Sequence, residues 1–267
     1  MTASDVLTRA RTLLFVPGDR PDRFPKAAAS GAGLVVLDLE DAVGSEDKTL
    51  ARHFVDEWLA KGNTCAVRVN AFGTPWHEDD LEAVAAHDCV AVIPKAETPD
   101  VLAGIALRVG DPLVALVETA SGVFAAQEIA KVEGVERLAL GTFDLAAELG
   151  VSPDDQMAMA WSRGALVLAS AAAEIAAPVD GVTSDVKDEQ RLNADVELAL
   201  RLGFGAKLCI HPRQVPLVER RFRPTEEALR WARAVVEAAA SGAVVVLDGK
   251  MVDKPVVDRA RRILQSE

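Results

Sequence analysis

Two consecutive apolar segments each end in an acidic residue, Glu118 in PLVALVETASG and Asp144 in RLALGTFDLA. Their continuous apolar runs are typical of strands that are buried on both faces. An acid at the carboxyl end of such a strand leaves the core at the rim where parallel α/β folds place their chemistry. Two acids on neighbouring strands suit Mg²⁺, which binds one or two carboxylates together with water and substrate oxygens. The alternative, that each acid only caps the following helix, is less favoured for the pair than for one acid alone.

Arg68 lies inside the apolar run CAVRVN, where a guanidinium needs an anionic partner. The partner is either an internal carboxylate or the carboxylate of a substrate, and we favour the substrate because the guanidinium fork matches a carboxylate through two hydrogen bonds. The preceding strand ends in LDLEDAV, whose acids Asp38, Glu40 and Asp41 are suited to hold metal-bound water or a basic residue. Helix capping is the competing interpretation for Asp41.

Two further segments carry residues with binding or catalytic chemistry. PGDRPDRFPK brings Arg20, Arg23 and Lys26 close together, which indicates either a phosphate-binding cluster or an ordinary solvated loop. His211 in CIHPRQ is either a base or, more often for such a histidine, a hydrogen-bonded turn residue. The chain has no Walker loop, no G-x-S-x-G motif and no zinc-type spacing of His and Cys.

Short β-rich apolar runs alternate with amphipathic helical patterns along the chain. The eight runs are Thr12–Val16, Leu34–Leu39, Cys65–Val69, Val90–Pro94, Leu113–Val117, Arg137–Leu140, Pro178–Val182 and Ala206–Ile210. The clearest helical patterns are Thr49–Lys61, Pro99–Val109, Val123–Val132 and Asp188–Leu202. This alternation predicts an α/β fold with a parallel sheet, and eight units predict a closed (β/α)8 TIM barrel over residues 1–223.

The pattern changes in residues 224–267. A helix is predicted from Pro224 to about Ser241, followed by a β-hairpin in AVVVLDGKMVDKP that turns at Asp248-Gly249, and by a last helix from Pro255 to Leu264. This helix–hairpin–helix extension is not needed to close a barrel. We therefore expect it to act as a lid over the site or as an arm that reaches a neighbouring subunit.

Composition excludes some classes of partner. The formal net charge of −12 over 267 residues argues against nucleic acid or an anionic membrane surface as a partner. No apolar run has the length of a membrane span, and the amino terminus lacks the apolar core of a signal peptide. The three cysteines form no C-x-x-C pair, which favours a packing role in a reducing cytoplasm.

Nine segments, in this order, resemble the citrate lyase beta subunit family, within the larger group of HpcH/HpaI aldolases and CoA-ester lyases. They are LLFVPGDRPDRFPKA, VVLDLEDAV, VRVNAFGT, VIPKAE, LVETASG, GTFDLAAELG, KLCIHPRQV, RPTEEALRWA and GKMVDKPVVDRA. The resemblance covers the chain from about residue 11 to its end and is closest to the stand-alone members of the family. It implies a (β/α)8 barrel that forms homotrimers.

The resemblance also implies roles for individual residues. Glu118 and Asp144 are expected to bind Mg²⁺, with Glu118 also contacting the substrate. Arg68 is expected to hold the keto-acid part of the ligand and to assist catalysis. Asp253, in GKMVDKP, matches an acid that related lyases place over the active site of a neighbouring subunit. Taken alone, Asp253 fits the start of a helix as well as it fits catalysis.

The resemblance places coenzyme A near the first and last barrel strands. The expected contacts are Phe15, Arg20, Lys26, Ile210 and His211.

Two positions depart from the family pattern. Phe143 stands where many relatives carry an acid, which makes the site less negative, and Asp22 stands where some relatives are basic.

The implied activity is a magnesium-dependent lyase that cleaves or forms a 3-hydroxyacyl-CoA, such as citramalyl-CoA or malyl-CoA, into a 2-keto acid and acetyl-CoA. One alternative is a citrate lyase beta subunit that acts on a citryl thioester with alpha and carrier subunits. Another is a non-catalytic protein that binds CoA or a keto acid. A free aldolase acting on hydroxy acids without CoA is a further enzyme alternative.

Overall fold

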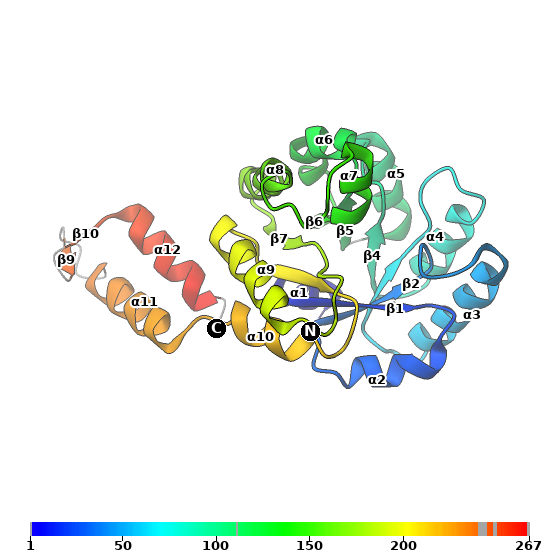
Figure 1. The fold of residues 1–267 in the computed structure, drawn as a ribbon, viewed down its shortest axis with the longest axis horizontal. Helices are drawn as coiled ribbons and strands as arrows, with labels where there is room; N and C mark the ends of the chain where they lie inside the picture. Colours follow the sequence, from blue (N-terminus) through cyan, green and yellow to red (C-terminus); the bar gives the residue numbers. More distant parts are fainter. Residues whose placement is uncertain (1, 111, 240–244, 248–249, 266–267) are drawn as a thin grey trace. The chain divides into compact units, whose positions relative to one another are not determined.

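The computed structural model describes residues 2–110, 112–239, 245–247 and 250–265 (Figure 1). Chain contacts divide it into two compact units, Met1–Glu219 and Arg220–Glu267. The predicted domain boundary, between residues 223 and 224, lies four residues further along the chain. Within the described residues, no helix combines the length and apolar character that crossing a membrane requires.

The first unit is a closed barrel of eight parallel strands in the order β1 to β8. The strands are β1 (Thr12–Pro17), β2 (Leu34–Asp38), β3 (Ala66–Arg68), β4 (Val90–Ile93), β5 (Leu113–Val117), β6 (Val135–Leu140), β7 (Ala176–Asp180) and β8 (Ala206–Cys209). The predicted (β/α)8 barrel is therefore confirmed. The predicted seventh strand, Pro178–Val182, begins and ends two residues later than β7.

Helices alternate with the strands around the barrel (Figure 1). They are α1 (Ala3–Arg9), α2 (Phe24–Ala28), α3 (Lys48–Leu59), α4 (His77–Ala85), α5 (Pro99–Val109), α6 (Ala120–Ala130), α7 (Thr142–Leu149), α8 (Ala160–Ala172), α9 (Glu189–Leu202) and α10 (Val215–Phe222), with short 3-10 turns at Pro21–Arg23 and Ser45–Asp47. The predicted helix Pro99–Val109 matches α5 at both ends. The other three predicted helices agree with α3, α6 and α9 within three residues.

Alternate strand residues fill the barrel, as a two-residue side-chain period requires. Leu13, Val36, Ala66 and Leu116 belong to this buried interior layer. Ala3, Leu7 and Ala10, in and just after α1, join the same cluster. The fully buried Arg137, at the start of β6, donates to the carbonyls of Leu7 and Ala10, at 2.9 and 2.6 Å. The amino-terminal helix is thus fixed by a buried guanidinium against the end of the barrel opposite the carboxyl rim.

The second unit contains α11 (Glu226–Ala239), the antiparallel pair β9 (Val245–Leu247) and β10 (Lys250–Val252), and α12 (Lys254–Gln265). The two helices pack through the buried Ala232, Val235 and Ala260. These elements agree with the predicted helix, hairpin and helix. The expected hairpin turn at Asp248-Gly249 and the expected helix end near Ser241 lie outside the described residues.

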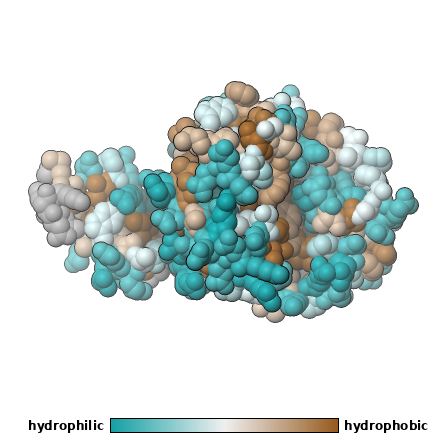
Figure 2. All heavy atoms as spheres, in the orientation of Figure 1, coloured by the Kyte–Doolittle hydropathy of each residue, from teal (hydrophilic) through white to brown (hydrophobic). Residues whose placement is uncertain are grey.

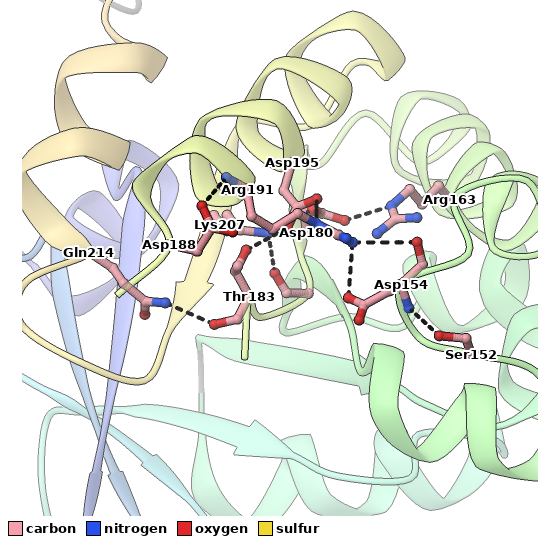
Figure 3. Close-up of polar contacts among 11 residues, drawn as sticks. Ser152, Asp154, Arg163, Asp180, Thr183, Asp188, Arg191, Asp195, Lys207 and Gln214 are labelled. Carbon is pink, nitrogen blue, oxygen red and sulfur yellow. Dashed lines mark hydrogen bonds and ion pairs between the residues drawn. The ribbon is translucent and has the colours of Figure 1, made fainter. Parts of the chain in front are cut away.

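A buried charge cluster fastens α8 to the barrel strands β7 and β8 (Figure 3). Asp180 accepts from Arg163 Nε at 2.9 Å and pairs with Lys207 Nζ at 3.1 Å. Lys207 also donates to the Gly181 carbonyl at 2.6 Å. Burial alone would raise the pKa of Asp180, but the charges of Lys207 and Arg163 hold that pKa below its ordinary value of 3.8.

We expect the substitution Asp180→Asn to lower the free energy of unfolding by about 3–5 kcal/mol, because it leaves two buried cations without a counterion. Thermal denaturation measures this loss, and Asp88→Asn, at an exposed position, is the matched control. Since the folded pKa is depressed, the stabilisation by Asp180 is complete above pH 3.8 and declines as the pH falls through the folded value. Equal melting temperatures for the two variants at pH 7 would contradict the prediction.

Candidate active site

A cavity of about 380 Å³ opens at the carboxyl rim of the barrel. Its lining combines four acids and one guanidinium with an apolar wall: Phe15, Pro17, Asp38, Asp41, Ala42, Arg68, Leu116, Glu118, Leu140, Gly141, Thr142, Phe143, Asp144, Val182, Leu208 and Ile210. Several polar lining residues follow an interior strand residue by two positions, as Asp38 follows Val36 and Glu118 follows Leu116. The strand period therefore directs these side chains into the mouth of the barrel.

Glu118 is held in place by backbone groups. Its Oε1 accepts a 2.9 Å hydrogen bond from the backbone N–H of Lys95, at the end of β4. Lys95 has a φ of 48°, in the left-handed region that non-glycine residues rarely occupy. On the other side, a Cβ at Gly141 would overlap the Glu118 side chain. The sequence did not reveal these two supports, because neither a strained lysine backbone nor the space beside a glycine has a distinctive residue pattern.

Glu118 and Asp144 line the same cavity, as the sequence predicted. Glu118 is buried, whereas Asp144 is exposed in the first turn of α7. Burial raises the pKa of Glu118 to about 7, the Lys95 hydrogen bond and Arg68 oppose that rise, and the charge of Asp144 adds to it. The charge of Arg68 therefore offsets this rise only in part.

The residues present fit Mg²⁺. Among the described residues, no group of three or more His, Cys, Asp or Glu side chains is arranged to hold a metal. Mg²⁺ needs only one or two carboxylates and takes its other oxygens from water and substrate. A dication beside Glu118 and Asp144 would also offset the charge repulsion between them.

Arg68 is paired with internal carboxylates. Its Nε and Nη2 donate to the two oxygens of Asp38 at 2.7 and 2.6 Å, and its Nη1 lies 2.9 Å from Glu40 and 3.1 Å from Asp41. The Phe15 ring lies 5.0 Å from the guanidinium carbon. Burial alone would lower the pKa of Arg68, but Asp38 and then the other acids raise it above its ordinary value. The internal partner that the sequence left as the less favoured alternative is present, and contact with a substrate stays a prediction.

Glu40 is a buried acid beside this arginine. Burial raises its pKa to about 8, with Arg68 opposing the rise and Asp41 adding to it. Lys48 supports the same segment, since its Nζ donates to the carbonyls of Leu39 and Glu40 at 2.8 Å each and to Asn70 at 2.6 Å. Asp38 at the end of β2 and the two acids that follow the strand therefore orient Arg68, which agrees with the supporting role expected from their position.

Of the five residues expected to contact coenzyme A, two line the cavity and three do not. Phe15 and Ile210 line the cavity, and Ile210 is 42% exposed. Arg20, Lys26 and His211 are absent from the cavity lining among the described residues. Arg20 is exposed and pairs with Asp22 at 3.0 Å, whereas the His211 Nδ1 accepts from the Arg213 backbone at 3.1 Å. Their contact with CoA stays a prediction.

Asp253 lies in the second unit, immediately before α12. Its Oδ1 accepts from the backbone N–H of Val256 at 3.2 Å, which is the geometry of a helix N-cap. The side chain is exposed. The capping role that the sequence allowed is therefore present, and the catalytic role stays a prediction.

A TIM barrel with paired acids and a guanidinium at its carboxyl rim is typical of a barrel enzyme, and the acids fit a hard cation. Residues 11–212 match the model of the HpcH/HpaI aldolase/citrate lyase family. The chain belongs to this family.

Named relatives span nearly the whole chain. A citrate lyase subunit beta-like protein of Mycobacterium tuberculosis is 38% identical over 260 residues, which cover 94% of this chain and 93% of the relative. A (3S)-malyl-CoA thioesterase of Cereibacter sphaeroides is 36% identical over 266 residues, covering 95% and 93%. The crystal structure of CitE from M. tuberculosis with magnesium, acetoacetate and coenzyme A superposes with a TM-score of 0.82 at 36% identity, covering 97% of this chain and 98% of CitE.

Proposed function

We propose that the chain is a magnesium-dependent carbon–carbon lyase. Its substrate would be the CoA thioester of a 3-hydroxy acid that carries one free carboxylate, such as malyl-CoA or citramalyl-CoA. The products would be a 2-keto acid and acetyl-CoA, and the reverse condensation uses the same groups. The relatives that bind magnesium with coenzyme A or with oxaloacetate support this class of reaction.

The charge of the cavity is the observation that carries the choice of substrate. Within the part of the chain that the structure describes, Arg68 is the only cation lining the cavity, and its guanidinium already faces Asp38 and Asp41. One substrate carboxylate can bind at the metal and Arg68. A citryl thioester carries a second free carboxylate, which would meet an apolar wall that includes Phe143 and Leu140 without a counterion.

Each of the candidate site residues would have a different role in the reaction. Glu118 and Asp144 would hold Mg²⁺, which supplies Lewis-acid stabilisation of oxygen charge. Arg68, fixed by Asp38, would orient the substrate carboxylate. The hydroxyl proton passes to solvent as the hydroxyl oxygen becomes the keto carbonyl, the adjacent carbon–carbon bond breaks, and its electron pair becomes the acetyl-CoA enolate. Asp253 would then donate a proton to the enolate carbon.

The test is a turnover assay of the purified chain with Mg²⁺ against malyl-CoA, citramalyl-CoA and citryl-CoA. We expect keto acid and acetyl-CoA from a substrate with one free carboxylate, and loss of that turnover with EDTA. Turnover of citryl-CoA alone would instead indicate a citrate lyase beta subunit. Release of free CoA without keto acid would indicate a thioesterase, an alternative favoured by the C. sphaeroides relative. Binding of acetyl-CoA without any turnover would indicate a non-catalytic protein.

A homotrimer is part of the proposal, as the family resemblance implies. The surface over α6 and α8 supports it, because Phe124, Trp161 and Leu168 are 78%, 60% and 73% exposed around a groove of apolar residues. Figure 2 shows apolar side chains gathered over these helices. Exposed apolar patches of this kind mark interaction surfaces.

We expect the wild type to have three times the chain mass by light scattering, and Leu168→Arg to be monomeric because it buries a charge in the contact. Leu107→Arg, at a 91% exposed leucine of α5, is the control and should leave the mass unchanged. A monomeric wild type, or a trimeric Leu168→Arg variant, would show that this surface does not form the trimer.

We also propose that the protein works in a reducing cytoplasm. Cys65, Cys89 and Cys209 are all free and buried, and burial raises the pKa of each thiol. Buried neutral thiols of this kind act as small apolar packing groups.

A further inference from the structure

Gln214 lies four residues after Ile210, the cavity-lining residue that follows β8, and it is only 2% exposed. Its Oε1 accepts from the backbone N–H groups of Ile210 and His211, at 2.9 and 3.3 Å. The backbone of Gln214 also donates to the His211 carbonyl at 3.0 Å. The side chain therefore closes the turn that carries Ile210 into the cavity.

The same amide reaches the neighbouring rim segment. Its Nε2 donates to the carbonyl of Thr183 at 2.8 Å, one residue after the cavity-lining Val182 (Figure 3). Both the donor and the acceptor ends of the buried amide are used. One side chain thus fixes the spacing between the segments that follow β7 and β8.

Thr183 is itself anchored. Its hydroxyl donates to Asp195 at 2.7 Å, and Asp195 accepts from Arg191 at 2.8 Å. Arg191 also donates to Asp154 at 2.9 Å (Figure 3). The carbonyl that Gln214 binds is therefore held by α9, so that the hydrogen bond positions the β8 segment against a fixed support.

We propose that Gln214 is a positioning residue for the CoA-thioester side of the cavity, where it fixes Val182 and Ile210 as facing walls of the binding site. The inference rests on the proposed function, because it assumes that a CoA thioester is the ligand that these walls contact. Gln214 acts through the two segments and does not touch the metal pair, so that thioester binding should depend on it far more than the chemical step.

Gln214→Glu is the informative variant. It keeps the size of the side chain and an acceptor for Ile210 and His211, but it places a carboxylate oxygen against the Thr183 carbonyl. A buried acceptor left without a donor costs about 1–3 kcal/mol, or roughly 5–150-fold in an equilibrium constant. We expect KM for the thioester and the Kd for acetyl-CoA to rise at least about 5-fold, with kcat and the Kd for Mg²⁺ within about twofold of the wild type.

Two other variants separate positioning from general stability. Gln190→Glu adds the same charge at an exposed position of α9 and should leave the constants unchanged. Thr183→Val removes the anchor to Asp195 and should raise KM in the same direction, with a non-additive effect when combined with Gln214→Glu. Arg191 and Asp195 remain paired in both variants.

Unchanged acetyl-CoA affinity in a folded Gln214→Glu protein would overturn the inference. So would a parallel fall of kcat, Mg²⁺ affinity and folded fraction, because it would show a purely structural residue. A wild type that binds acetyl-CoA without turnover would refute the proposed lyase and still test Gln214 through the Kd. A wild type that binds no acetyl-CoA would overturn both.

Discussion

Glu118→Gln should lose at least about 10³-fold in kcat and nearly all Mg²⁺ affinity. The amide retains an acceptor for the 2.9 Å hydrogen bond from Lys95, so that the change removes mainly the negative charge. Metal stabilisation of oxygen charge contributes several kcal/mol to such reactions, and each 1.36 kcal/mol corresponds to about a tenfold rate change. Steady-state kinetics and calorimetric titration with Mg²⁺ measure the two losses.

Thermal unfolding distinguishes this loss of function from a loss of fold. Because burial raises the pKa of Glu118 to about 7, the carboxylate is poorly compensated without metal, and the amide should not destabilise the metal-free protein. Mg²⁺ should then raise the melting temperature of the wild type and leave that of the variant unchanged. Glu97→Gln, at an exposed position two residues after Lys95, is the control. Normal turnover and Mg²⁺ binding in Glu118→Gln would remove Glu118 from the metal site.

The barrel could be predicted from the sequence because its signals are local. Each strand is a short apolar run between helical patterns, and few folds other than a closed barrel accommodate eight such strand–helix units. The position of Glu118 in the mouth of the barrel was also predictable, since the strand period carries Leu116 and Glu118 to the same side. These features need only the order and spacing of residues.

Interactions between distant segments could not be predicted in the same way. Arg68 reads as an isolated buried cation in the sequence, and its two hydrogen bonds to Asp38 become visible only when β2 and β3 pair side by side. Gly141 reads as an ordinary helix-start glycine, whereas the register of β5 and β6 places it against Glu118. Specific support of the site thus depends on strand register, which a single sequence leaves open.

The strand register also explains how the barrel mouth accommodates the buried side chain of Glu118. Leu116 pairs with Ala139, so that the next inward-facing positions are Glu118 and Gly141. A residue without a side chain beside the buried acid leaves room for its carboxylate. Arg68 pairs separately with Asp38, Glu40 and Asp41. Within the described residues, four acids and one guanidinium line the cavity, and this excess of negative charge would favour binding of a cation beside Glu118 and Asp144.

Asp253→Asn should lower kcat by about 10²–10⁴-fold while leaving acetyl-CoA and Mg²⁺ affinities unchanged, because it removes a proton donor and no binding contact. Asparagine caps helices about as well as aspartate, so that the hydrogen bond from the Val256 N–H is preserved. Asp258→Asn, which removes the same charge within α12, is the matched control and should keep wild-type turnover.

The cap is the 3.2 Å hydrogen bond from the Val256 N–H to the side-chain oxygen of Asp253, and asparagine retains an oxygen that can accept it. A loss of turnover in Asp253→Asn therefore cannot be assigned to an uncapped α12. Asp253→Ala, which removes both the cap and the proton donor, should lose turnover and also lower the melting temperature, since an N-cap contributes about 1 kcal/mol. Wild-type turnover in Asp253→Asn would leave Asp253 as a capping residue alone.

If Asp253 serves the active site of a neighbouring subunit, two inactive variants should complement each other. In a mixed trimer of Glu118→Gln and Asp253→Asn chains, some sites combine an intact metal pair from one chain with an intact Asp253 from the next. Co-expression of the two variants should then restore a measurable fraction of the wild-type kcat, whereas each variant alone stays inactive. Only a contribution between subunits can rebuild a complete site from two defective chains. If a mixture that is shown to form mixed trimers recovers no activity, Asp253 therefore acts on the metal pair of its own chain or does not act in catalysis at all.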